Sequence, residues 1–200
     1  MSKLNNAQLT ELLLQMVETE RGGEQVYINA ITAAVNPDLK KEWEEYLEET
    51  RNHQKVIEGV CQDLGVDPES PSPGRDVVRH HGESLVKAIQ LALKTAPGPA
   101  AELVAAECVV LAETKDHQNW ELLGKCAEAA SGNVAKVLKA AYDEVEQDED
   151  HHYLHTKGWT RELWIQSLGM PAVLPPPEEV KNVETEIGAA RAEQQREEML

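Results

Sequence analysis

The 200-residue sequence contains only three cysteines, Cys61, Cys108 and Cys126, and none forms a CxxC pair with another. An odd number of widely spaced cysteines argues against a disulfide framework, a zinc ribbon and a rubredoxin-type iron site. Isolated cysteines usually behave as small apolar residues. Each of the three is therefore expected to be buried rather than to bind a metal.

Basic residues are also scarce. The chain has 19 Lys and Arg against 36 Asp and Glu, which gives a formal net charge of −17. Contacts with phosphate groups need a basic surface, so this balance disfavours nucleic acids and anionic membranes as partners. The same charge attracts divalent cations toward the protein. Most of the carboxylates are expected to be solvated, and the functional question is which few are not.

Long apolar segments are missing too. The longest uncharged apolar runs, such as residues 12–17 and 109–112, are far too short to cross a bilayer. The first 15 residues, MSKLNNAQLTELLLQ, lack the basic start, apolar stretch and cleavage site of a secretion signal. They are typical of an amphipathic helix that is capped by Asn5 or Asn6. We therefore expect a cytoplasmic protein with no membrane contact.

No segment alternates with the period of a β-strand, and proline and glycine divide the chain into helices. The expected helices are residues 5–35, 38–65, 75–95, 100–129 and 134–167. Tight connections at 36–38 and 131–133 predict two antiparallel hairpins, which helix 75–95 joins. The predicted fold is all-α, an antiparallel four-helix bundle with a helical crossover over residues 1–170. A Pro-rich linker and a charged C-terminal helix occupy residues 171–200.

The apolar stripe of each long helix is interrupted near its middle by carboxylate or imidazole groups. A single buried histidine needs only a hydrogen-bond partner. Carboxylates from four helices at the same depth repel one another unless protons or cations offset their charge. The pattern therefore favours a metal site in the bundle core. The interrupting residues are Glu20, Glu49, His53, Glu113, His117, Glu149 and His152, with Asp148 beside them.

Four of these positions carry a resemblance to a known superfamily. Glu149-Asp-His-His152 is a Glu-x-x-His pair, and Glu20 and Glu113 each stand seven residues before an aromatic residue. Over residues 10–165 the chain resembles the ferritin-like di-iron and di-manganese carboxylate proteins, which include rubrerythrins and bacterioferritins. The resemblance implies two Fe or Mn ions, with iron favoured. The implied ligands are Glu20, Glu49, His53, Glu113, Glu149 and His152.

The second helix departs from that pattern, because Glu49 precedes His53 by four residues and Thr50 occupies the position of the usual carboxylate. The segment is similar to the Glu-Thr-x-x-His helix of the YciE/YciF branch of ferritin-like proteins. Spacings of three and four residues both place two side chains on one helical face. Glu49 is therefore still expected to bind the metal.

Other polar residues lie within a helical turn of these positions. Glu24 and His117 each follow a proposed ligand by four residues and serve either as additional ligands or as groups that orient ligands. Four further residues are expected near the site: Asp148, Tyr46, Tyr142 and His155. His155 can form a hydrogen bond with a ligand, and each tyrosine is a hydrogen-bond donor, a redox-active phenol or an aromatic residue that only packs in the core. The Gly22-Gly23 pair lowers the stability of its helix relative to alanine. The two glycines either let another helix approach closely, or leave room for an oxygen species beside the metals, or are tolerated sequence drift without a function.

The resemblance implies an oxidoreductase that reacts with peroxide or dioxygen, of peroxidase, ferroxidase or oxidase type, in a stress response. Electrons would come from an external donor, because no rubredoxin motif is present. One alternative is a non-catalytic metal-binding or iron-handling stress protein, which can be a homo-oligomer. A second alternative is a metal-free helical scaffold whose acidic surface and C-terminal tail bind another protein.

Overall fold

The protein is described by a computed structural model that covers residues 4–200, so residues 1–3 of the predicted bundle lie outside it. Five long helices come first: α1 (Asn6–Ala33), α2 (Pro37–Asp63), α3 (Pro73–Thr95), α4 (Gly98–Ala129) and α5 (Gly132–Ser167). Short helices follow: α6 (Pro177–Val180), α7 (Glu186–Gln194) and a 3-10 turn (Arg196–Met199). Residues 4–200 contain no strand, so the predicted all-α class is confirmed.

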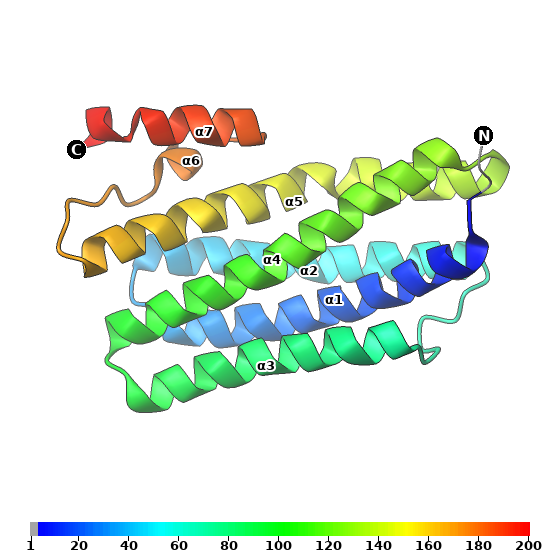
Figure 1. The fold of residues 1–200 in the computed structure, drawn as a ribbon, viewed down its shortest axis with the longest axis horizontal. Helices are drawn as coiled ribbons and strands as arrows, with labels where there is room; N and C mark the ends of the chain where they lie inside the picture. Colours follow the sequence, from blue (N-terminus) through cyan, green and yellow to red (C-terminus); the bar gives the residue numbers. More distant parts are fainter. Residues whose placement is uncertain (1–3) are drawn as a thin grey trace.

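The long helices pack side by side along the long axis of the molecule (Figure 1). Helix α1 contacts α2 and α4, and α5 contacts α2 and α4, so these four helices surround a common core. Helix α3 runs back along the bundle and packs on the outside of α1 and α4. Because α3 returns the chain to the opposite end, α2 and α4 run in the same direction. The predicted bundle with a helical crossover is confirmed.

Polar residues define where the helices begin. The Asn5 side chain accepts hydrogen bonds from the amides of Ala7 and Gln8, and Asn36 caps α2 in the same way ahead of Pro37. Such caps satisfy amides that have no partner inside the helix. Capping Asn residues and Pro can be recognised in the sequence as signals for helix ends. The long helices therefore begin and end within about two residues of their predicted limits.

The crossover helix is fixed to α1 by a buried ion-pair network. The carboxylate of Glu18 accepts hydrogen bonds at 2.8 Å from Arg75 Nε and 2.8 Å from Arg79 Nε, both on α3. Further along, a Cβ added to Gly82 would lie 3.3 Å from the Cα of Gly22. Glycine at these two positions therefore allows the backbones of α1 and α3 to approach closely, as one interpretation of Gly22 predicted.

The bundle has two apolar cores, one toward each end. The first includes Trp43 and Trp159, and the second includes Leu13, Leu123 and Leu138. Cys61 and Cys108 are buried in these cores, where burial raises the pKa of both thiols to about 11, and Cys126 is partly buried. No helix of residues 4–200 is both long and apolar enough to cross a membrane.

The C-terminal segment differs from the single charged helix that was predicted. After α6 the chain turns at Asn182, whose φ of 47° lies in the left-handed region that asparagine tolerates better than most residues. Thr185 then caps α7 by accepting a hydrogen bond from the Gly188 amide. The turn lets Val183 and Ala192 pack against Leu154 of α5. Figure 1 shows α6 and α7 lying along the α5 side of the bundle.

Candidate metal centre

Six buried polar side chains from four helices meet between the two apolar cores, and we call them the central cluster. Each is at most 4% exposed. Two triads within it have potential ligand atoms that all lie within 4.8 Å of one another, and Glu149 belongs to both. The buried His and Glu groups can therefore hold metal. The central cluster consists of Glu20 on α1, His53 on α2, Glu113 and Asp116 on α4, and Glu149 and His152 on α5.

Both histidines turn the same ring nitrogen toward the carboxylates. Nδ1 of His53 lies 2.9 Å from Oε1 of Glu149, and Nδ1 of His152 lies 3.5 Å from Oε2 of Glu113 and 3.9 Å from Oε1 of Glu149. The other nitrogen, Nε2, is held by a carboxylate: Asp148 at 3.3 Å for His53 and Glu49 at 2.8 Å for His152. Histidines that bind metals usually donate their second N–H in this way, which leaves Nδ1 free for an ion.

The carboxylates of the central cluster have fewer hydrogen-bond donors than their burial requires. Oε1 of Glu20 accepts a hydrogen bond from the Trp120 indole at 2.8 Å, but its Oε2 has no partner among residues 4–200. One oxygen each of Glu113, Asp116 and Glu149 is equally unpartnered within that range. A buried acceptor without a donor costs free energy. Cations bound among these oxygens offset that cost, so the residues present fit a metal site.

The shifted pKa values of the central cluster also indicate that it fits a metal site. Burial first, and then the charge of Asp116, raises the pKa of Glu20 and of Glu149 well above the usual range. Burial and the nearby Glu113 raise the pKa of Asp116 to about 7. Burial alone lowers the pKa of His152, but the nearby carboxylates of Glu113 and Glu49 outweigh burial and raise the pKa to about 10. Two divalent cations would balance the four carboxylates when these are ionised.

Glu49, a predicted ligand, lies at the edge of the central cluster. Its side chain is 40% exposed, and its carboxylate contacts Nε2 of His152 rather than the side on which Nδ1 faces the other carboxylates. Asp148, predicted as a neighbour, holds His53 in the equivalent way. In this position each carboxylate fixes the orientation of an imidazole ring and increases its basicity.

We therefore expect Glu49→Gln to weaken metal binding by roughly 10- to 100-fold without changing the number of ions bound, as is usual for residues that orient a ligand. Glu44→Gln, an exposed change on the same helix, serves as the control. Metal titration of both variants measures affinity and stoichiometry together. The loss of an entire equivalent of metal from Glu49→Gln alone would instead establish Glu49 as a ligand.

Three further predicted neighbours lie away from the central cluster. Glu24 pairs with Arg51, whose Nε donates to it at 2.9 Å, and the hydrogen bonds from Arg51 lower its pKa. His117 lies 2.9 Å from Asp150 and stacks on Tyr153. The hydroxyl of Tyr142 donates to Glu146 at 2.6 Å. The structure does not bring Glu24, His117 or Tyr142 into contact with the proposed ligands.

Tyr46 and His155 occupy a different position, beside the central cluster. The Tyr46 ring lies against the His152 ring, with centroids 4.2 Å apart. Its hydroxyl points away, donating to Glu42 at 2.8 Å and lying 3.2 Å from Nδ1 of His155. A second buried ring, Tyr27, approaches His152 edge-on at 6.2 Å, and burial raises its pKa well above normal. Two phenols therefore flank one imidazole.

Asp116 is the member of the central cluster that was not predicted from the sequence. It follows Glu113 by three residues, the same spacing as Glu149 and His152. On α2 the residue three positions before His53, where a Glu-x-x-His pair has its carboxylate, is Thr50, which is buried but offers no carboxylate. Helix α4 thus supplies two carboxylates and α2 supplies an imidazole alone. The spacing of three residues within Glu-Thr-Lys-Asp was the signal available in the sequence.

An acid-lined pocket of about 380 Å³ reaches the central cluster from the surface, between α4, α5 and residues 184–187. Glu149 and Trp120 form part of its wall. The other carboxylates that line it are Glu121, Glu146, Asp150, Glu184 and Glu186, and no Lys or Arg of residues 4–200 lines it. A pocket with charge of one sign concentrates counter-ions. We call it the acidic pocket.

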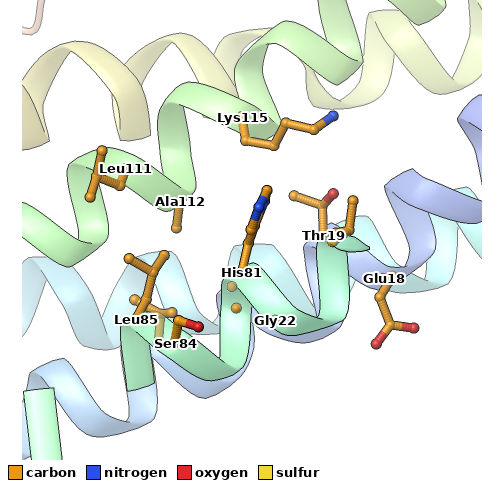
Figure 2. A pocket seen from close by; sticks show the side chains of 13 residues that line it. Glu18, Thr19, Gly22, His81, Ser84, Leu85, Leu111, Ala112 and Lys115 are labelled. Atoms are coloured by element: carbon orange, nitrogen blue, oxygen red, sulfur yellow. The ribbon is translucent and has the colours of Figure 1, made fainter. Parts of the chain in front are cut away.

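A second pocket of about 380 Å³ lies between α1, α3 and α4 and is mostly apolar. Figure 2 shows the His81 ring extending from α3 toward α4, where Ala112 and Lys115 line the opposite wall. Gly22 and Gly23 contribute to its α1 side. None of its lining residues belongs to the central cluster, so the pocket lies beside the candidate metal centre rather than on it.

Comparisons with protein-family models, with curated proteins and with solved structures found no match to this chain. The class of protein is therefore defined by the fold and the site themselves. The chain is an all-helical bundle with buried His and Glu groups that can hold metal.

Proposed function

We propose that the protein is a ferritin-like di-metal oxidoreductase that binds two iron or manganese ions, with iron favoured, and reacts with peroxide or dioxygen. The supporting observation is the set of unpartnered carboxylate and imidazole atoms buried among four helices. Ligands that are mostly carboxylates with two imidazoles suit iron and manganese better than the thiolate-rich sites that zinc and copper(I) prefer.

The proposed ligands are Glu20, His53, Glu113, Asp116, Glu149 and His152. The ferritin-like pattern takes one Glu from each of two helices and a Glu-x-x-His pair from each of the other two. Here α1 and α5 follow that pattern, whereas the carboxylate missing at Thr50 of α2 is replaced by Asp116 of α4. This exchange preserves the total of four carboxylates and two imidazoles, which is the number of ligands that a di-metal site of this kind uses.

The surroundings of the central cluster suit redox chemistry. Bound iron or manganese would supply the electrons for reduction of peroxide or dioxygen. The two apolar cores limit access by water from the ends of the bundle. The acidic pocket offers cations a route to Glu149, and the rings of Tyr27 and Tyr46 lie close enough to His152 to supply electrons. Because Cys61 and Cys108 lie in the apolar cores, we assign the reductant to a separate molecule.

We further propose that residues 1–170 form the functional bundle and that residues 171–200 are an extension docked on it. Salt bridges hold the two together: Arg161 of α5 donates to Glu178 at 2.7 Å, and Glu162 accepts from Arg196 Nε at 2.7 Å. Glu178 and Glu162 are both buried. The extension also closes one side of the acidic pocket, since residues 184–187 line it.

The proposal is tested by loading chelator-treated protein anaerobically with Fe²⁺, removing unbound iron and then adding hydrogen peroxide. We expect at least two iron equivalents per chain, as a two-metal site requires, and rapid growth of near-ultraviolet absorption on oxidation. Addition of ascorbate should then sustain the consumption of peroxide over many turnovers. The same loading with Mn²⁺ compares the two metals.

Two outcomes would contradict parts of the proposal. Iron that oxidises once and does not turn over with reductant would support the non-catalytic metal-binding alternative instead. Iron content near zero, equal in the wild type and in a variant with both Glu113 and Asp116 replaced by amides, would remove the di-metal centre altogether. A variant with the exposed change Glu144→Gln should behave like the wild type.

A further inference from the structure

A second cluster of potential ligands lies where the C-terminal extension meets the bundle, and we call it the outer cluster. It consists of Glu42 on α2, His155 on α5 and Glu179 on α6. Nδ1 of His155 is 2.9 Å from Oε2 of Glu179 and 4.0 Å from Oε1 of Glu42. Glu42 and His155 are buried, and a third of the Glu179 side chain is exposed. No residue of the outer cluster is shared with the central cluster.

The imidazole of His155 is oriented by the backbone. Its Nε2 lies 3.0 Å from the carbonyl oxygen of Val183, which can only accept a hydrogen bond, so Nε2 carries a hydrogen. In the neutral ring Nδ1 therefore has a free lone pair, and that lone pair faces the two carboxylates. A backbone carbonyl in this position is one of the usual partners of a metal-binding histidine.

The carboxylates of the outer cluster have too few donors for the acceptors that meet there. Glu42 accepts hydrogen bonds from the Tyr46 hydroxyl and the Trp159 indole, one on each oxygen. Tyr46 has only one hydroxyl hydrogen, so it cannot also donate to His155. Oε2 of Glu179 has no hydrogen-bond partner in the part of the chain that the structure describes. One imidazole nitrogen and two carboxylate oxygens thus face one another, and a bound cation would satisfy all three at once.

We propose that Glu42, His155 and Glu179 bind one divalent transition-metal ion, separate from the central cluster, and that this ion clamps the C-terminal extension to the bundle. One imidazole with two carboxylates is a donor set that Zn²⁺, Mn²⁺ and Fe²⁺ accept, with the remaining positions open to water or another ligand. Burial and the neighbouring Glu179 raise the pKa of Glu42 to about 9, so a proton is the competitor that the ion displaces.

A metal ion in the outer cluster would hold the C-terminal extension to the bundle, because its ligands lie on both parts of the chain. Glu42 and His155 belong to long helices of the bundle, whereas Glu179 belongs to a helix of only four residues in the extension. Ligation of Glu179 would therefore fix α6, and with it the Val183 carbonyl that holds His155. Lys181 lies two residues beyond the ligand and is exposed, so trypsin cleavage at this residue reports on release of the extension.

The test uses Zn²⁺ and the full-length protein, with the central cluster disabled by Glu149→Gln. This variant should retain about one Zn²⁺ equivalent, and adding Glu179→Gln should remove it, since a single donor set of this kind holds one ion. In wild-type background, Zn²⁺ should slow cleavage at Lys181 at least fivefold, and Glu179→Gln should abolish that protection. Glu197→Gln, an exposed change in the same extension, should change neither result.

Each alternative result has a definite meaning. The outer site is overturned if Glu179→Gln, in the wild type and in the Glu149→Gln background, leaves both the zinc content and the cleavage rate unchanged. It is also overturned if Glu149→Gln protein that is folded by circular dichroism binds no Zn²⁺. Zinc that is lost with Glu179→Gln but not with Glu149→Gln would support the outer site, and the iron content of the wild type decides the di-metal centre. The two proposals can therefore fail independently.

Discussion

Glu149→Gln is expected to remove both ions of the central cluster while making the metal-free protein more stable. Glu149 contributes to both triads of the central cluster, so no pair of ions retains its full ligand set without it. In the absence of metal, folding at pH 7 must either protonate this carboxyl or bury its charge among other carboxylates. Glutamine has the same shape and avoids that cost, which we expect to raise the free energy of unfolding by about 1–3 kcal/mol.

The opposite signs of the two effects make this a sharp test. Metal content after anaerobic loading with Fe²⁺ should fall by about two equivalents, and urea unfolding in the presence of a chelator should shift to higher midpoint. Glu144→Gln, on the same helix but exposed, should leave both measurements unchanged. A purely structural role for Glu149 makes the contrary prediction, because loss of a needed structural group destabilises the chelated protein.

The fold could be predicted because its determinants are local. Asn5, Asn36 and Pro37 mark helix starts in the sequence itself, and the short segments between helices leave the hairpins little choice of geometry. The C-terminal segment was harder. Its break at Asn182 depends on Val183 packing against Leu154 of α5, a contact between residues far apart in the chain.

The central cluster could be predicted only in part, because a stripe on a long helix can be followed by steps of three or four residues. On α4 the buried positions run through Val109, Glu113, Asp116, Trp120 and Leu123. The step predicted from the sequence ran instead from Glu113 to His117, which the structure places against Asp150. Asp116 and His117, three and four residues after Glu113, both lie on roughly the same face of the helix as Glu113. Only the tertiary packing determines which of the two is buried in the central cluster.

The outer cluster could not be predicted from the sequence, for a different reason. Glu42 stands at the side of the apolar stripe of α2, where a carboxylate is usually solvated. Its burial depends on Trp159 of α5 and on the arrival of α6, which brings Glu179 to it. His155 was predicted as a neighbour of the central cluster, and only the folded extension shows which carboxylates it faces.

The chelated protein is expected to be most stable near pH 5 and to lose stability as the pH rises to 9. The native-state pKa values of Asp116, Glu20 and Glu149 are raised, so their contribution is complete below the unfolded values near 4 and is lost as the pH rises through the native ones. For Asp116 that loss ends at about pH 7. His152 acts in the same direction between about 6.5 and 10, because its native pKa is also raised.

Carboxylates whose pKa is lowered, such as Glu18 and Glu162, act below this range, since their contribution is lost only as the pH falls through their native values. When the native and unfolded pKa values of a group differ by one, the difference corresponds to about 1.4 kcal/mol of stability. A net change of a few kcal/mol should therefore lower the melting temperature by roughly 10 °C between pH 5 and 9. The measurement is a series of thermal melts with chelator and with excess Mn²⁺.

Bound Mn²⁺ should remove this decline, because metal binding displaces the protons whose loss destabilises the chelated protein. The stabilisation by Mn²⁺ should therefore increase with pH, and Asp116→Asn should flatten the chelated profile around pH 7 because the amide does not ionise. A chelated protein whose melting temperature rises from pH 5 to 9 would contradict the assignment of buried, mutually repelling carboxylates. If instead the decline is present but Mn²⁺ leaves it unchanged, the carboxylates are confined together as described but do not bind the metal.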